Sequence, residues 1–237
     1  MHLSEQYSVK MIAHRGLSAL EQENTHASFI AAGNRSFFGI ETDVHLTSDG
    51  RFVLMHDHKT GRVSETDLVI RETDYATLRA LQLNERGGRP GRTDIRIPNL
   101  EEYVEICKRY DKTAVLELKP LFEPAQLEQI LDTFRQKEWL DRAVFISFNF
   151  ENLARLNAIA PSLPKMFLTG EWEDILPEKL AACGMGLDIY YPALTEERVG
   201  ACRAAGVPVN VWTVDSRDKA EELVSWGVAY ITTNILE

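Results

Sequence analysis

The stretch MIAHRGLSALEQENTHASF, Met11 to Phe29, reads as a strand, a polar loop and the start of a helix in immediate succession. Its apolar residues stop at His14-Arg15-Gly16, and the segment 25–33 is expected to be helical. A strand that passes through a short loop into a helix is the repeating unit of parallel α/β folds. An imidazole next to a guanidinium at the end of such a strand suits a site that handles an anion and moves a proton.

The same alternation continues along the chain. Helical spacing is clearest in PNLEEYVEICKRY, where Leu100, Tyr103, Val104 and Cys107 are apolar and Asn99 is a good N-cap. Glu102 is placed to complete a capping box there. Further helices are expected at 25–33, 124–138, 150–160, 195–205 and 217–226, with a short one near 74–81. The strand-like runs are VKMIAH, FFGIETDVHL, RFVLMH, TAVLELK, AVFISF, PKMFLTG, LDIYYPA, PVNVWTV and AYITTN.

Regular alternation of this kind predicts an α/β fold with a parallel sheet, either an open doubly wound sheet or a closed (β/α)8 TIM barrel. No GxGxxG follows the first strand, and 237 residues approach the roughly 250 typical of the barrel. We therefore expect one TIM-barrel domain over residues 1–237, with RFVLMH as an additional strand. The polar segment 57–98 reads as a small insertion between strand 2 and helix 2. It either covers the mouth of an active site or is a solvated excursion.

Composition excludes several classes of protein. The formal net charge of −10 argues against general nucleic-acid binding, so an anionic substrate would need a local positive field from a few side chains or a metal. No apolar run approaches the roughly 20 residues that span a bilayer, and the first ten residues are too polar for a signal peptide. A cytoplasmic protein without stable membrane insertion is expected. Cys107, Cys183 and Cys202, all expected in helices, read as reduced buried thiols.

Acidic side chains occur on strands that a barrel would bury. In GIETDVHL, Glu41 and Asp43 share one face of the strand with His45, and in AVLELKP, Glu117 and Lys119 also share a face. Two carboxylates on one side of a strand repel each other unless a cation lies between them, and oxygen ligands suit Mg²⁺ or Ca²⁺. Glu117 is a candidate third ligand, and Lys119 a contact for an anionic substrate. A solvated edge strand and a structural ion pair are the alternatives.

Two histidines end apolar strands, His14 and His56. Barrel enzymes place catalytic groups at such strand ends, and two imidazoles can act as acid and base in one turnover. Trp212 also ends a strand, either as an aromatic wall for a substrate or as a packed rim residue. The other histidines are expected to be non-catalytic, with His45 the doubtful one because it faces the same way as Asp43; they are His2, His26, His45 and His58.

A set of short motifs in this order resembles the glycerophosphodiester phosphodiesterase family over nearly the whole chain. The motifs are HRG, ENT, ETDV with TSDG, HD, IPNLEEY, ELK and VWTV. The resemblance implies a TIM barrel that hydrolyses glycerophosphodiesters to glycerol 3-phosphate and an alcohol with one divalent cation. The alternatives are a lysophospholipase D-like enzyme acting on lipids and a non-catalytic sugar-phosphate-binding barrel. The implied partner is a small-molecule substrate, and the oligomeric state is left open.

Carried over by position, the resemblance makes His14 and His56 the acid–base pair. The resemblance also implies that the metal ligands are Glu41, Asp43 and Glu117. The implied substrate contacts are Arg15, Lys119 and Trp212. Which histidine is the acid, and whether water or the neighbouring glycerol hydroxyl attacks, are left open.

The chain departs from the family pattern at two positions. Gln22 stands where the family usually has proline before ENT, which implies a looser loop. Asn234 replaces an aspartate near the C-terminus, which puts a supporting residue in doubt.

Overall fold

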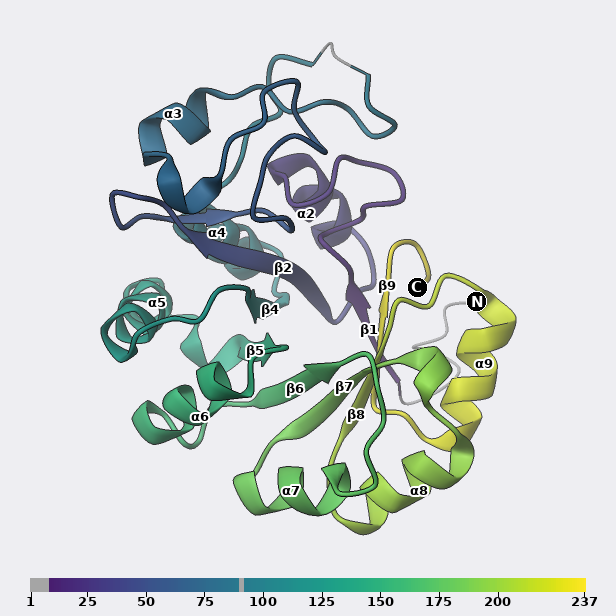
Figure 1. Ribbon diagram of the computed structural model, residues 1–237. Helices are drawn as coiled ribbons and strands as arrows, with labels where there is room; N and C mark the ends of the chain where they lie inside the picture. Colours follow the sequence, from purple (N-terminus) through teal and green to yellow (C-terminus); the bar gives the residue numbers. More distant parts are fainter. Residues whose placement is uncertain (1–8, 90–91) are drawn as a thin grey trace.

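The structure is a computed structural model that describes residues 9–89 and 92–237; the segments 1–8, which includes His2, and 90–91, in the insertion, lie outside the described residues. Within the described part, all strands except β3 run parallel and close into a barrel (Figure 1). Closure follows from β1, which pairs with both β2 and β9. The TIM-barrel prediction is confirmed. The barrel strands are β1 (Lys10–Ala13), β2 (Gly39–Leu46), β4 (Thr113–Leu118), β5 (Ala143–Ser147), β6 (Lys165–Thr169), β7 (Gly186–Tyr190), β8 (Val209–Trp212) and β9 (Tyr230–Thr233).

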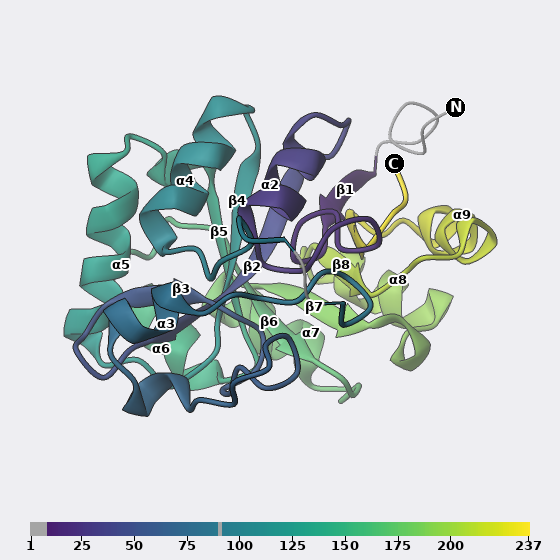
Figure 2. The same ribbon diagram turned by 90° about the horizontal axis from the view of Figure 1, so that it is seen from above.

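Helices surround the barrel, as the view from above shows (Figure 2). The capping box predicted before Leu100 is present: Glu102 N donates to Asn99 Oδ1 over 2.8 Å, and Asn99 N donates to Glu102 Oε2 over 2.9 Å. The predicted helices are found within a few residues of their expected ends. They are α2 (His26–Gly33), α4 (Leu100–Arg109), α5 (Pro124–Gln136), α6 (Phe150–Ile159), α8 (Glu196–Ala204) and α9 (Arg217–Trp226).

One helix of the barrel was not among the helices predicted from the sequence. Helix α7 (Leu176–Cys183) begins with Pro177 in its first turn and ends at Gly184, whose left-handed φ of 64° closes the helix. It contains Cys183, while Cys107 lies in α4 and Cys202 in α8, so all three cysteines are helical and free as expected; Cys107 and Cys202 are buried, but the prediction of burial is wrong for Cys183, which is only partly buried. None of the helices in the described ranges is both long and apolar enough to cross a membrane.

The insertion is a folded layer rather than a loose excursion. It follows β3 (Phe52–Leu54), which lies antiparallel to the end of β2, and it contains the 3-10 turn η1 (Ile70–Glu72) and helix α3 (Tyr75–Ala80). It forms a small core of its own with the end of β3. The buried members of that core are Val53, Met55, Val63, Ile70, Leu78, Leu83, Ile95 and Ile97. In Figure 1 the insertion lies beside α2, away from α7 and α8.

The barrel interior changes character along the strands. A buried apolar cluster inside it includes Ile12, Val115 and Ile146. Val115 is the register partner of Glu41, and Glu117 is the partner of Asp43. Along β4, the inward-facing residue is therefore apolar at position 115 and acidic at position 117, nearer the carboxyl end of the strand. Because parallel strands present their carboxyl ends at one side of a barrel, polar groups from several strands meet there.

Candidate active site

The first strand delivers His14 and Arg15 to the barrel mouth through a tight turn. Arg15 and Gly16 both have positive φ, 54° and 76°, which directs the chain back toward β2. A Cβ at position 16 would lie 2.5 Å from Ser28 Oγ, so only glycine fits here. The turn also places Arg15 N so that it donates to Glu41 Oε2 over 2.8 Å.

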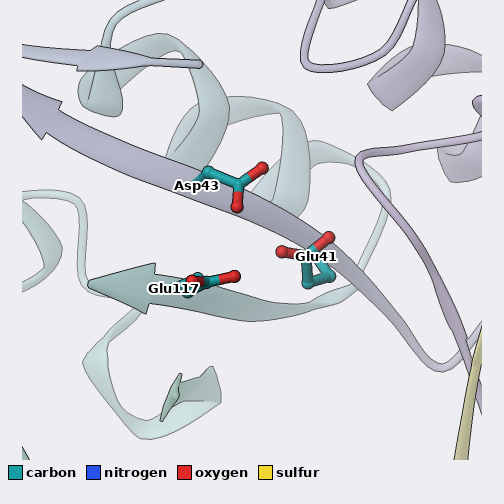
Figure 3. Close-up of side chains that lie close together, drawn as sticks. All are labelled: Glu41, Asp43 and Glu117. Atoms are coloured by element: carbon teal, nitrogen blue, oxygen red, sulfur yellow. The ribbon is translucent and has the colours of Figure 1, made fainter. Parts of the chain in front are cut away.

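Three buried carboxylates meet inside the mouth. One oxygen from each of Glu41, Asp43 and Glu117 lies within 4.8 Å of the others, and Figure 3 shows the side chains turned toward one another from β2 and β4. Burial, and the charge of Asp43, raise the pKa of Glu117 to about 8 and that of Glu41 well above its ordinary value. The predicted facing of Glu41 and Asp43 on one side of their strand is confirmed, and the solvated-edge alternative is wrong because β2 lies between β1 and β4.

Two cations and an amide hold Asp43 in its charged form. Although burial opposes this, Lys119 and Arg15 lower the pKa of Asp43 to about 2. Lys119 Nζ lies 3.4 Å from Asp43 Oδ1 and 2.8 Å from Glu117 Oε1, and Arg15 Nε lies 3.9 Å from Asp43 Oδ2. Asn24 Nδ2 donates to Asp43 Oδ2 over 2.7 Å. The sequence analysis assigned no role to Asn24. Its position in the ENT motif, two residues before α2, was the only indication that it belongs to the site.

His14 is held by a residue from the other end of the chain. Asn234 Oδ1 lies 2.8 Å from His14 Nδ1, and a carbonyl oxygen only accepts, so Nδ1 carries the hydrogen and Nε2 is left as an acceptor. Asn234 is oriented in turn by Asp215, whose Oδ2 accepts from Asn234 Nδ2 over 2.6 Å. Burial, reinforced by Arg15, lowers the pKa of His14 to about 4. Asn234, which the sequence showed as a departure from the family pattern, therefore contacts a predicted catalytic histidine directly.

His56 has a charged partner instead. Its Nδ1 lies 2.7 Å from Asp57 Oδ1, and Arg62 Nε donates to Asp57 Oδ2 over 2.5 Å. Burial lowers the pKa of His56 below its ordinary value, although Asp43 acts in the opposite direction. Neither Asp57 nor Arg62 was predicted as a supporting residue, and the HD motif was the only signal for the first.

One cavity of about 460 Å³ unites the predicted site. Trp212 forms part of its wall and packs against Phe148 and Tyr190, with ring centroids 5.7 and 5.3 Å apart, so it is both a rim residue and a wall. Asp188, buried on β7, also lines this cavity, and burial raises its pKa to about 7. The predicted residues that line the cavity are His14, Arg15, Glu41, His56, Glu117, Lys119 and Trp212, with Asp43 directly behind them.

A second cavity of about 940 Å³ opens beside the first and shares His56 and Lys119 with it. Its walls come from the insertion, from the end of β2 and from the loop after β4. His45 lies here rather than among the carboxylates, with Nε2 3.4 Å from the carbonyl oxygen of His56. Burial lowers the pKa of His45 to about 4.

Gln22 does not interrupt the loop that leads into α2. Its carbonyl oxygen accepts a hydrogen bond from Thr25 Oγ1 over 2.6 Å, and the side chain is buried. Thr25 then caps α2 by accepting from Ser28 N. The backbone turn that precedes the helix is thus closed by hydrogen bonds without a proline.

The chain is similar to known proteins over nearly its whole length. A model of the glycerophosphoryl diester phosphodiesterase family matches residues 14–237. A glycerophosphodiester phosphodiesterase of Caldanaerobacter subterraneus is 29% identical over 228 residues, covering 94% of this chain and 93% of that protein. A phosphodiesterase of Oleispira antarctica, solved in complex with the product sn-glycerol-3-phosphate, is 27% identical with a TM-score of 0.89, covering 99% of this chain and 96% of that one. A glycerophosphodiester phosphodiesterase of Parabacteroides distasonis is 28% identical with a TM-score of 0.79, covering 96% and 93%. The chain belongs to the glycerophosphoryl diester phosphodiesterase family.

Proposed function

We propose that this protein hydrolyses glycerophosphodiesters to sn-glycerol 3-phosphate and an alcohol, with the barrel and its insertion acting as one catalytic domain. The observation that carries the proposal is the cavity of about 460 Å³, which brings two histidines, two cations and two carboxylates of the acidic cluster to one place. A phosphodiester is an anion, and attack on it requires both charge neutralisation and proton transfer. The product bound to the Oleispira antarctica relative supports this substrate class.

The acidic cluster fits a divalent cation. Asp43 Oδ1 is buried without a hydrogen-bond partner among the described residues, although Lys119 Nζ lies 3.4 Å away, and burial together with the charge of Asp43 raises the pKa of Glu117. Glu41, Asp43 and Glu117 would hold the ion, and three oxygen ligands suit Mg²⁺ or Ca²⁺. Such an ion supplies charge that stabilises the phosphoryl oxygens in the transition state.

The protein's own groups divide the remaining work. Arg15 and Lys119 bind the phosphoryl oxygens, and Trp212 packs against the glycerol carbons. His14 is neutral near pH 7 and presents Nε2 as an acceptor, so it removes the proton from the nucleophile. The general-acid role is assigned to His56, because the Asp57 carboxylate beside its Nδ1 raises the pKa of the imidazole against the effect of burial and stabilises the imidazolium that donates a proton to the departing alcohol. Groups of this kind contribute about 10² to 10⁴ in rate.

The direct test is release of sn-glycerol 3-phosphate from a panel of diesters, with and without added divalent ions. Glycerophosphocholine, glycerophosphoethanolamine and glycerophosphoglycerol should all yield the product, and chelation should stop the reaction. A protein that binds glycerol phosphate without turning over any diester would instead be a non-catalytic binding barrel.

A lipid substrate is the second candidate, because Phe148 and Tyr190 at the mouth are 49% and 42% exposed. Such side chains could contact an acyl chain. Adding lysophosphatidylcholine to the panel separates the two activities. Faster turnover of the lipid than of glycerophosphocholine would favour a lysophospholipase D-like enzyme.

A further inference from the structure

Arg62 lies in the insertion and connects two carboxylates from different parts of the site. Its Nη1 and Nη2 donate to the two oxygens of Glu23 over 2.9 and 2.7 Å, and its Nε donates to Asp57 Oδ2 over 2.5 Å. Glu23 belongs to the loop between β1 and α2, whereas Asp57 directly follows His56 in the loop after β3. One guanidinium therefore spans both sides of the cavity mouth.

Each of these carboxylates also contacts a residue of the proposed mechanism. Glu23 Oε1 accepts from Arg15 Nη1 over 3.0 Å, and Asp57 Oδ1 lies 2.7 Å from His56 Nδ1. The result is a continuous chain of hydrogen bonds from Arg15 through Glu23, Arg62 and Asp57 to His56. Its two ends line the cavity of about 460 Å³, and its centre does not.

We propose that Arg62 is a positioning residue that fixes the phosphate-binding Arg15 and the acid–base His56 in one relative geometry. The inference rests on the proposed function. It gives the insertion a catalytic task, because the insertion supplies the group that joins the two ends of the site. Arg62 itself does not touch the reacting atoms.

The chemistry of the guanidinium suits this position better than an ammonium would. Its planar fork binds the Glu23 carboxylate through two parallel hydrogen bonds while Nε remains free for Asp57. Lysine is a point charge and cannot meet both carboxylates in this fixed geometry. Without Arg62, Glu23 would have Arg15 as its only cationic partner among the described residues, and would draw that guanidinium away from the phosphate.

The simplest alternative is that Arg62 merely fastens the insertion to the barrel. Arg92 provides a matched control for that role. Its Nη1 donates to Glu21 Oε2 over 2.8 Å, so it also joins the insertion to the loop before α2. Its other carboxylate partner is Asp94, within the insertion. Among the described residues, no hydrogen bond or ion pair joins Glu21 or Asp94 to Arg15 or His56.

The experiment compares Arg62→Ala, Arg62→Lys and Arg92→Ala for hydrolysis of glycerophosphocholine at saturating Mg²⁺. Arg62→Ala should lower kcat by up to about 100-fold, the effect of misplacing groups by about 1 Å, and should raise KM because Arg15 is less well placed. Arg62→Lys should fall between Arg62→Ala and the wild type. Arg92→Ala should stay within twofold of the wild type.

Chemical rescue separates positioning from fastening. The Arg62 side chain is 45% exposed, so free guanidinium can reach the space left by Arg62→Ala. Millimolar guanidinium should restore part of kcat in Arg62→Ala and leave Arg92→Ala unchanged, with sodium chloride as the ionic control. Equal kcat and KM in the two alanine variants would overturn the inference. So would a loss in Arg62→Ala that guanidinium does not reverse. A wild-type enzyme inactive on every diester would overturn the proposed function instead.

Discussion

His14 and Asn234 are 220 positions apart in the chain, yet a hydrogen bond of 2.8 Å joins their side chains. Because β1 and β9 are neighbours in the closed barrel, the residues that follow these two strands meet at the mouth. Asn234 is neutral, and the carboxylate of Asp215 lies one side chain farther away. His14 consequently has a neutral partner, whereas His56 has a charged one.

Exchanging the amide and the carboxylate should change the pH dependence of the reaction. In the double variant Asp215→Asn with Asn234→Asp, a carboxylate would lie beside His14 Nδ1, and an opposite charge at this distance raises a histidine pKa by about one to three units. The other charged groups that act on His14, Arg15, Asp43 and Glu23, are unchanged. Since a base works only when deprotonated, the acidic limb of the kcat/KM profile should move to higher pH.

Asp215→Asn alone is the control for that exchange. It removes the remote carboxylate without placing a charge beside the imidazole, so its acidic limb should stay close to that of the wild type. An unshifted limb in the double variant would mean that His14 is not the base whose titration limits the rate.

Removal of either histidine should nearly abolish turnover. His14→Ala and His56→Ala are each expected to lower kcat by about 10² to 10⁴. Neither histidine belongs to the acidic cluster, so thermal stabilisation by added Mg²⁺ or Ca²⁺ should persist in both variants. Stopped assays of sn-glycerol 3-phosphate and thermal unfolding scans measure the two properties. A variant that keeps more than about a tenth of the wild-type kcat would contradict its assigned role.

The acidic cluster should make the chelated protein less stable as the pH rises. Glu117 has a folded pKa of about 8 against an ordinary value of 4.5, so its neutral form is favoured by folding and stability is lost as it ionises. The histidines with pKa values lowered to about 4, His14 and His45, change charge below pH 6.5. The window from pH 6.5 to 8 therefore isolates the buried carboxylates with raised pKa values, which are Glu117 and Glu41 of the cluster and Asp188 on β7.

Thermal unfolding in the presence of a chelator tests this expectation. The unfolding temperature of the wild type should fall between pH 6.5 and 8, and that of Glu117→Gln should fall less. Added Mg²⁺ or Ca²⁺ should raise the temperature most in the wild type, since an ion at 100 times its Kd stabilises by about 2.7 kcal/mol. Full activity after exhaustive chelation would contradict a metal-dependent reaction.

Small head groups should be cleaved at similar rates. The alcohol half of the substrate would extend into the cavity of about 940 Å³, where Lys59, Arg71 and Glu72 are exposed to solvent. Loosely held groups discriminate poorly because contacts that are not made cannot differ between substrates. We expect kcat/KM for choline, ethanolamine and glycerol diesters to agree within about tenfold, or 1.4 kcal/mol. A hundredfold preference would reveal a specific alcohol pocket in this cavity.

The sequence predicted those parts of the site that follow from the geometry of single strands. Alternation along GIETDVHL is enough to place Glu41 and Asp43 on one face, and the carboxyl ends of parallel strands must converge. Helix α4 was equally predictable because its capping box and apolar spacing are local. Eight residues assigned from these arguments and from the family resemblance lie together in the structure, and their chemical roles stay predictions.

Contacts between loops could not be predicted in this way. Arg62 is one arginine in a polar segment, and nothing in its neighbourhood in sequence indicates that it meets Glu23, 39 positions earlier. Asn234 likewise appeared only as a departure from a pattern. Such pairings depend on how loops fold over the barrel mouth, where no periodic pattern constrains the chain.

Closure of the barrel by β9 has a consequence for synthesis of the protein. The hydrogen-bond partner of His14 is Asn234, which follows the last strand. During translation, β1 is synthesised long before β9, so the two strands cannot pair until β9 has also been made. The contact between them has a very long sequence separation and therefore forms slowly. A nascent chain that lacks β9 has an open edge on β1 and an unsupported His14. Catalytic competence should therefore appear abruptly, only once the final strand has left the ribosome.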